Sequence, residues 1–260
     1  MANTKLGFTN WVDSATLKNG TGGAAPALDE TSPYTMAKVL TTDRYTLWKT
    51  AAVPAATLNL DIDLGANRAV TAIGLLGYRP SVAGIVTSVE VSSAAAAAGY
   101  VPAAWTVQAT ITGIVLDPRD IGAVINSVSH RYWRFTFNNA GTAAWTLGRL
   151  WLGSSTDLGA IHTPGGLYAP FRNRLETPLP GGAVVLTDLG DPGADFVHPW
   201  AQIESSLRST LLGLNAKRGS FLLIDSGGSF FEVYLRRGRV PIGQDSHILY
   251  DINLDMARLP

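Results

Sequence analysis

The sequence contains no cysteine, which excludes disulfide bonds, thiolate metal sites and cysteine nucleophiles. Only 15% of its residues are charged, and Lys+Arg and Asp+Glu both number 20, so the formal net charge is zero. A chain without net charge has no strong field to gather nucleic acid non-specifically, and we expect no nucleic-acid partner. The beginning of the chain lacks the apolar core of a signal peptide, and no apolar stretch is long enough to cross a bilayer. We therefore expect a soluble protein made in the cytoplasm, without membrane insertion.

Motifs of the common enzyme classes are also missing. None of the 4 histidines lies in an H-E-x-x-H pattern, and the chain has no G-x-S-x-G elbow and no Walker loop. No pair of glutamates is placed as in glycoside hydrolases. We expect a protein without enzyme activity and without a cofactor.

The residues that are present predict an all-β chain. Hydrophobic residues make up 46% of the sequence, and the 27 glycines and 14 prolines provide many turns. This composition is typical of β-sandwiches and of proteins that bury much surface in assemblies. Short strand-like runs recur between turn signals, at 58–65, 69–78, 86–93, 105–116, 131–137 and 145–153. Their spacing predicts an antiparallel sandwich.

The run "LNLDIDLG" at 58–65 alternates strictly between apolar and polar residues, so one face of its strand belongs to the core. The other face carries Asp61 and Asp63. Paired aspartates are weak candidates for a Ca²⁺ site, because hard cations are bound by several oxygens. A lone D-x-D on a strand is more often a solvated face, and we expect no metal.

The run "HRYWRFTF" at 130–137 combines two arginines with four aromatic rings. Read as a strand, it places Trp133, Phe135 and Phe137 on one face, which predicts a core strand. Arg131 and Arg134 can then lie over a tyrosine ring or pair with a carboxylate. The alternative is a ligand-binding surface.

Gly/Pro/Ser-rich segments divide the chain. We predict an N-terminal arm or loop at 1–34, a β-sandwich at 35–154, a linker at 155–182 and a second, β-sandwich-like domain at 183–260. Within that last domain, apolar residues recur at helical spacing after Pro199, which predicts one α-helix at about 199–216. The predicted architecture is therefore two β domains with a single helix.

The first domain resembles the discoidin, or coagulation factor 5/8 type C, family of galactose-binding-like jelly rolls. The matching runs are "TTDRYTLWKT", "LNLDIDLG", "AVTAIGLLG", "SVEVSS", "RYWRFTF" and "LGRLWLG", in the order of the family. The resemblance implies a jelly-roll sandwich in which the core contains Trp48, Leu64, Trp133, Phe135 and Phe137. Members of the family bind sugars, lipids or proteins through variable loops at one end. The disulfide of its extracellular members is absent here, which argues against a secreted adhesin.

The whole chain also resembles minor tail proteins of long-tailed bacteriophages, above all the distal tail or baseplate ring proteins. The order of modules and the C-terminal run "SFLLIDSGGSFFEVYLRRGRVPIGQDSHILYDINLDM" carry this second resemblance. It implies a structural protein of the virion tail, assembled in the host cytoplasm, that forms a homo-oligomer. That oligomer would be a hexameric ring joining the tail tube to the hub and other tail proteins. Arg236, Arg237 and Arg239 are the interface candidates.

The alternative function is a carbohydrate-binding module that attaches to a host surface glycan. Aromatic residues near predicted strand ends are its ligand candidates, namely Tyr78, Tyr100 and Trp105. Trp105 is the best of the three, because Pro102 and an alanine-rich loop precede it. Its position at the head of a strand nevertheless favours a core role.

Overall fold

A computed structural model gives the fold of the chain. The residues that it describes are 3–18, 31–42, 46–51, 57–80, 86–95, 102, 104–112, 119–140, 143–158, 167–171, 174–178, 184–188, 193–204, 209, 211–213, 220–235, 242–244 and 249–258. They fall into two compact units. The N-terminal unit consists of Gly7–Thr156 with Gly228–Phe230, and the C-terminal unit consists of Met1–Leu6, Asp157–Gly227 and Phe231–Pro260.

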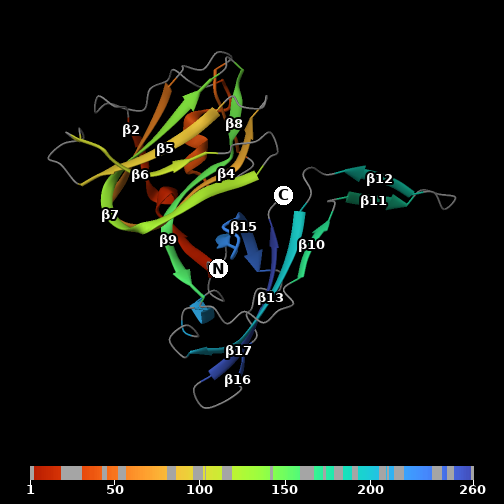
Figure 1. Ribbon diagram of the computed structural model, residues 1–260. Helices are drawn as coiled ribbons and strands as arrows, with labels where there is room; N and C mark the ends of the chain where they lie inside the picture. Colours follow the sequence, from red (N-terminus) through yellow and green to blue (C-terminus); the bar gives the residue numbers. More distant parts are fainter. Residues whose placement is uncertain are drawn as a thin grey trace. The chain divides into compact units, whose positions relative to one another are not determined.

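The N-terminal unit is built from antiparallel strands (Figure 1). Its sheet has the order β1-β9-β4-β7-β5-β6, with β2 and β8 also on β4 and with β3 on β8. The strands are β1 (Lys5–Asn10), β2 (Thr16–Lys18), β3 (Trp48–Lys49), β4 (Thr57–Pro80), β5 (Val86–Ala94), β6 (Thr106–Ile111), β7 (Arg119–Asn139), β8 (Trp145–Leu147) and β9 (Arg149–Asp157). Two short 3-10 helices, η1 (Trp11–Ser14) and η2 (Met36–Leu40), complete the unit. The predicted all-β class is confirmed.

Strands β4 and β7 are long, 24 and 21 residues, and run beside each other with three register shifts. Two glycines of β4, Gly65 and Gly77, lie beside such shifts and have φ angles of 75° and 63°. Side chains rarely adopt such angles, so glycine is required there. The amide of Gly65 donates to Asp63 Oδ1 at 2.8 Å, and that of Gly77 donates to Asp120 Oδ1 at 2.9 Å. At these two of the three register shifts, an aspartate carboxylate accepts a hydrogen bond from the glycine amide.

Large aromatic side chains fill the core of the N-terminal unit. The ring centroids of Trp48 and Trp145 lie 4.9 Å apart, and those of Trp48 and Phe137 lie 5.9 Å apart, both in edge-to-face geometry. Trp48, Trp133, Phe135 and Phe137 are completely buried, and Leu64 is 3% exposed. All five residues that the discoidin resemblance places in the core therefore lie there.

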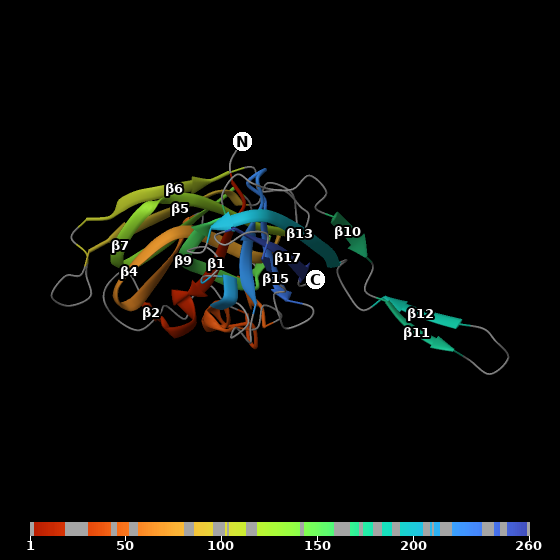
Figure 2. The same cartoon turned by 90° about the horizontal axis from the view of Figure 1, so that it is seen from below.

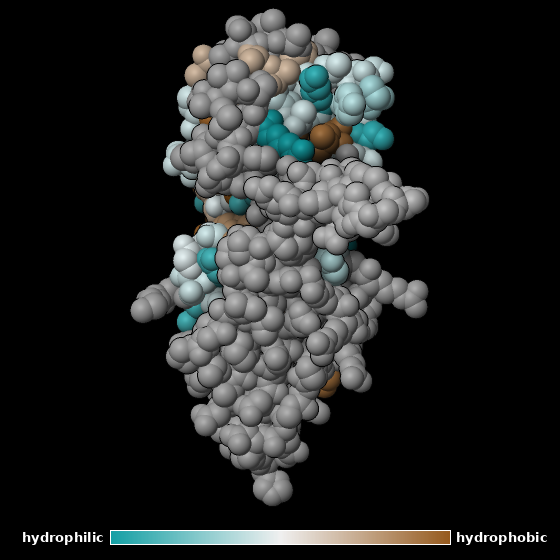
Figure 3. All heavy atoms as spheres, turned by 90° about the vertical axis from the view of Figure 1, so that its right-hand side faces the viewer, coloured by the Kyte–Doolittle hydropathy of each residue, from teal (hydrophilic) through white to brown (hydrophobic). Residues whose placement is uncertain are grey.

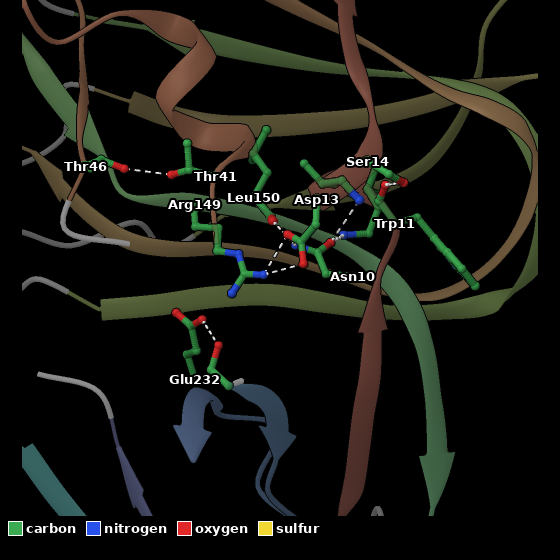
Figure 4. A network of polar contacts seen from close by, with 12 residues as sticks. Asn10, Trp11, Asp13, Ser14, Thr41, Thr46, Arg149, Leu150 and Glu232 are labelled. Atoms are coloured by element: carbon green, nitrogen blue, oxygen red, sulfur yellow. Dashed lines mark hydrogen bonds and ion pairs between the residues drawn. The ribbon is translucent and has the colours of Figure 1, made fainter. Parts of the chain in front are cut away.

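The first residues of the chain differ from the predicted arm, because β1 and β2 are part of the sheet and η1 connects them. Asn10 joins them to β9 (Figure 4): its Nδ2 donates to Leu150 O at 2.8 Å, and its Oδ1 accepts from Leu152 N at 3.0 Å. Both carboxylate oxygens of Asp13 accept from Arg149 Nη2, at 2.6 and 2.7 Å. Asn10 also accepts from Val12 N at the start of η1, the position of a helix N-cap. An asparagine at this N-cap position was the sequence signal from which η1 could have been predicted.

The C-terminal unit is also made of strands, in the order β10-β13-β17-β15-β14 with β16 on β17. A separate two-stranded sheet is formed by β11 and β12, which lie side by side in Figures 1 and 2. The strands are β10 (Leu167–Phe171), β11 (Arg174–Pro178), β12 (Val184–Asp188), β13 (Gly193–Glu204), β14 (Phe221–Ile224), β15 (Phe230–Leu235), β16 (Ile242–Gln244) and β17 (Leu249–Arg258). The segment expected to be a linker at 155–182 thus contains two strands.

The predicted helix at about 199–216 is wrong over 199–204, which form the end of β13. The helical spacing of Trp200 and Ile203 has another cause. In the register of β13 against β17, Trp200 opposes Ile252 and Ile203 opposes Tyr250, so β13 has one extra residue, a β-bulge. The extra residue of a bulge can place two apolar residues of one strand three positions apart, and the sequence alone does not distinguish this spacing from that of a helix turn. Beyond it, Ser209, Leu211 and Leu212 have helical conformation.

On the face shown in Figure 3, the hydrophobic residues among the described ones form small separate groups. The large hydrophobic residues that are exposed are Tyr34, Val107, Val124, Leu212 and Tyr234. Within the described ranges, no helix has the length and hydropathy needed to cross a membrane.

Candidate functional site

The polar face of the β4–β7 ladder carries two arginine–aspartate pairs. Asp61 on β4 lies opposite Arg134 on β7. Nε and Nη2 of Arg134 donate to the two carboxylate oxygens of Asp61 at 2.6 and 2.7 Å. The Asp61 side chain is only 1% exposed, whereas that of Arg134 is 22% exposed. This two-point contact fixes the plane of the guanidinium, which a single hydrogen bond would not do.

The second pair joins Arg131 to Asp63, with Nε and Nη2 donating at 2.7 and 2.9 Å. Burial by itself would raise the pKa of Asp63. The hydrogen bonds from Arg131 and from the Gly65 amide, with the positive charges of Arg131 and Lys18, outweigh burial and hold the pKa below its usual 3.8. The Arg131 guanidinium also lies 5.0 Å from the centre of the Tyr132 ring. Both contacts agree with the alternatives inferred from the "HRYWRFTF" run.

These pairs explain the D-x-D pattern. Both aspartates, the weak candidates for a metal site, accept hydrogen bonds from a guanidinium through both oxygens. Among the described residues no group of three or more potential ligands gathers. The alternating aspartates of β4 therefore position arginines.

Trp105, which directly precedes β6, lies against the first pair. The Arg134 guanidinium carbon is 4.4 Å from the centre of the Trp105 ring, within the range of a cation–π contact. The tryptophan residue is partly exposed. The Asp61 carboxylate binds the edge of the Arg134 guanidinium, and the guanidinium lies over the Trp105 indole. We call these three residues, which come from three different segments, the Trp105 site.

Hydrogen-bonding side chains surround this site on the same face of the sheet. Across the strands, Arg134 lies opposite Ser92 on β5, and the neighbouring position Thr136 lies opposite Glu90. Ser92 Oγ lies 3.4 Å from Glu90 Oε1, and Thr136 Oγ1 donates to Asn59 at 2.8 Å. Glu90 and Thr136 are partly exposed, and Asn59 is exposed. The face thus presents hydroxyl, amide and carboxylate groups next to an indole ring.

The other ligand candidates have different positions. Tyr78 is completely buried, with its ring 5.7 Å from that of Trp145, so it is a core residue and no stacking surface. Burial raises the pKa of Tyr78 well above its usual 10.0. Its hydroxyl makes no hydrogen bond among the described residues. Tyr100 lies outside the described residues.

The interface candidates Arg236, Arg237 and Arg239 also lie outside the described residues.

The contact between Trp105 and Arg134 was not predicted from the sequence. Arg134 is 29 positions away in the sequence, and no spacing rule connects a residue before one strand to an arginine in another. The alternation of residues around Arg134 predicts the sheet face on which it lies, but only the strand pairing identifies the residues beside it.

Among the described residues of the unit, two further tryptophans have an arginine over the ring: the buried Trp151, with Arg149 at 5.7 Å, and Trp11, which serves as a comparison. Arg68 lies 4.8 Å from the centre of the Trp11 ring, and Trp11 Nε1 donates to Ala69 O at 3.1 Å. Trp11 is partly buried like Trp105, but Arg68 is exposed and forms no ion pair with a described carboxylate. Of these two partly exposed tryptophans, only Trp105 contacts an arginine that a described, buried aspartate holds.

Several solved structures resemble part of this chain. They include chitosan-binding module 1 of a chitosanase/glucanase from Paenibacillus sp. IK-5, with 14% identity, 56% of this chain and 99% of that chain covered, and a TM-score of 0.43. Two more are modules of a family 31 glycoside hydrolase from Clostridium perfringens. CBM32-1 has 12% identity, coverages of 56% and 99%, and a TM-score of 0.44. CBM32-3 has 19% identity, coverages of 56% and 95%, and a TM-score of 0.43.

No protein-family profile and no curated protein matches the sequence. At the identities and TM-scores of the solved structures, similarity does not assign a function. The function has to be inferred from the residues of this chain.

Proposed function

We propose that the N-terminal unit is a carbohydrate-binding module and that the Trp105 site binds the sugar. The observation that carries this proposal is the partly exposed indole of Trp105, backed by Arg134, which Asp61 holds in place. A sugar ring has an apolar C–H face that stacks on an indole and a rim of hydroxyl groups that need hydrogen-bond partners. The Trp105 site supplies both kinds of contact.

Rigidity supports the same proposal. An exposed tryptophan that is free to rotate loses conformational entropy when a ligand orders it, which weakens binding. Here the guanidinium packs on the indole and is itself held through two hydrogen bonds to a buried carboxylate. The indole is therefore positioned before the ligand arrives.

The charges near the site favour a sugar without acidic groups. Three carboxylates, Asp61, Asp63 and Glu90, lie on this part of the sheet with the cations Arg131, Arg134 and Lys18. The charges balance, and both arginines already contact an aspartate. Among the described residues of this part of the sheet the cations do not outnumber the carboxylates, which disfavours a sulfate, a uronate or a nucleic-acid phosphate. We propose a neutral or amino sugar.

The tail-ring function expected from the second resemblance has no support in the described residues. The interface arginines lie outside them. A structural role in a tail, with its hexameric ring and its tail-tube and hub contacts, stays a prediction. A sugar-binding unit on such a tail protein would be compatible with the tail prediction and with the sugar-binding proposal.

A glycan array of neutral, amino and acidic oligosaccharides tests the proposal with the full chain. We expect binding to neutral or amino sugars and a loss of affinity of about tenfold or more in Trp105→Ala. Trp11→Ala is the matched control, because it also removes a partly buried indole that carries an arginine. Equal losses in the two variants, or no binding to any sugar, would contradict the proposal.

A further inference from the structure

The carboxylate of Glu90, on β5, differs from the two aspartates on the same part of the sheet. Asp61 and Asp63 each accept hydrogen bonds from a guanidinium through both oxygens. Glu90 forms no ion pair with any described cation. Among the described residues its carboxylate contacts the hydroxyl of Ser92, with 3.4 Å between Oε1 and Oγ. Glu90 is partly exposed, so its negative charge can be reached by a ligand.

The contact with Ser92 directs the Glu90 side chain toward the Trp105 site. Ser92 lies directly opposite Arg134 in the β5–β7 ladder, and Glu90 lies opposite Thr136. Glu90 and Arg134 are therefore diagonal neighbours, roughly 7–8 Å apart and within reach of long side chains. The Arg134 guanidinium in turn lies 4.4 Å from the centre of the Trp105 ring. A ligand that stacks on this indole and extends across Ser92 reaches the Glu90 carboxylate.

The nearby cations leave the charge of Glu90 in place. Arg134 is paired with the buried carboxylate of Asp61. Lys18 lies opposite Asp61 on β2, and β4 and β7 separate β2 from β5. Three strand spacings of about 4.8 Å put the main chain of Lys18 about 14 Å from that of Glu90. This exceeds the Debye length of about 10 Å at 0.1 M salt, so Lys18 is largely screened from Glu90.

We propose that Glu90 makes the Trp105 site selective for an amino sugar with a free amine, whose ammonium group binds the Glu90 carboxylate. This selectivity rests on the proposed sugar site. An ammonium group has three N–H donors and no acceptor, which matches a carboxylate that accepts only. Such charge-assisted hydrogen bonds are about twice as strong as those between neutral groups. An acetylated amine at the same place is neutral and offers a single donor.

The expected preference is moderate, because Glu90 is only partly buried. Water competes for an exposed ion pair, and salt screens it. The Ser92 hydroxyl, on a residue that is 3% exposed, contacts one oxygen of the carboxylate and leaves the other to the ligand. We expect the free-amine sugar to bind about fivefold more tightly than its acetylated form.

Calorimetric titration of the full chain with a matched pair of ligands is the test. One ligand is an oligosaccharide of glucosamine, and the other is the same oligosaccharide with every amine acetylated. The titrations are made at about pH 6, where an amine with a pKa near that of an α-amino group is protonated. The ratio of the two affinities isolates the charge of the amine, because the rings and their linkages are identical.

Glu90→Gln keeps the size of the side chain and removes its charge, and it should lower this ratio from about five to about one. Asp157→Asn is the matched control. It removes one exposed carboxylate at the end of β9, which carries no residue of the Trp105 site, and changes the net charge equally. This variant should keep the wild-type ratio. Raising the salt from about 0.1 to about 1 M should reduce the wild-type ratio, because the Debye length falls to about 3 Å.

Four results would overturn the selectivity. These are equal affinities of the wild type for the two ligands, a Glu90→Gln variant that keeps the preference, an equal loss of preference in Asp157→Asn, and a preference that salt does not change. Trp105→Ala separates this inference from the proposed function, because it should weaken the binding of both ligands. Equal binding of both ligands that Trp105→Ala removes would leave the sugar site in place and reject only the role of Glu90. Absence of binding, or binding that Trp105→Ala leaves intact, would reject the sugar site and the selectivity together.

Discussion

Leu60 and Phe135 pair across the β4–β7 ladder one position away from Asp61 and Arg134, yet the two faces of the ladder have different roles. Leu60 and Phe135 are buried and belong to the hydrophobic core. The face with Asp61 and Arg134 orders charged groups and holds the Trp105 indole. The same pair of strands thus supplies stability through one face and a binding geometry through the other.

The largest effect is expected from the apolar face. Trp133→Ala removes a completely buried indole opposite Ile62, and we expect a loss of about 3–5 kcal/mol in the free energy of unfolding from urea titrations. Asn59→Ala, an exposed position of the same ladder, should change it by about 0.5 kcal/mol or less. Similar losses in the two variants would remove the distinction between the faces.

A smaller effect is expected at the buried carboxylate of the polar face. Asp61→Ala leaves the Arg134 guanidinium without its two strongest acceptors, and we expect a loss of about 1.5–3 kcal/mol. The double variant Asp61→Ala/Arg134→Ala should lose less than the sum of the single variants, because both remove the same interaction. Additive losses in urea titrations would show that the pair does not act as a unit.

The Arg131–Asp63 pair predicts a contribution to the free energy of unfolding that depends on pH in the acid range. The folded-state pKa of Asp63 lies below its usual value, so its contribution to stability is fully present above about pH 4 and is lost as the pH falls through the folded-state pKa. Wild type and Asp63→Asn should therefore differ in urea midpoint at pH 7 and differ less at pH 3. A gap that stays constant between these pH values would argue against this role of the Arg131 pair.

The smallest effect on stability is expected at Trp105 itself. Its ring is partly exposed and lies outside the aromatic core, so Trp105→Ala should lower the free energy of unfolding by about 1 kcal/mol or less. Sugar affinity should fall much more than stability. A large loss of stability in a urea titration would assign Trp105 to the scaffold instead.

Much of the N-terminal unit could be predicted from sequence, because its strands alternate. The run at 58–65 placed Asp61 and Asp63 on one face, and the run at 130–137 placed Phe135 in the core. The alternation of apolar and polar residues along a strand is a local property and does not depend on which strand lies beside it. The all-β class followed from the same runs.

The remaining features depend on long-range pairing. Asp61 and Arg134 are 73 positions apart, so the carboxylate that holds the arginine follows from the register and not from either strand. The end of β13 was predicted as helix because a bulge gives Trp200 and Ile203 a helical spacing. The hydrogen bonds from Asn10 to β9 could not be predicted from the sequence, because the Asn10 side chain binds one backbone carbonyl and one backbone amide. Backbone groups carry no sequence signature.

The most direct test of the central claim observes the indole groups during a sugar titration. The chain has 7 tryptophans, and their indole N–H signals in a proton–nitrogen NMR spectrum can be followed one by one. The missing signal in Trp105→Ala and in Trp11→Ala identifies these two. We predict that a neutral or amino oligosaccharide that binds on the array moves the Trp105 signal with saturation and leaves that of Trp11 in place. A bound sugar that leaves the Trp105 signal unmoved would contradict the assignment of the site.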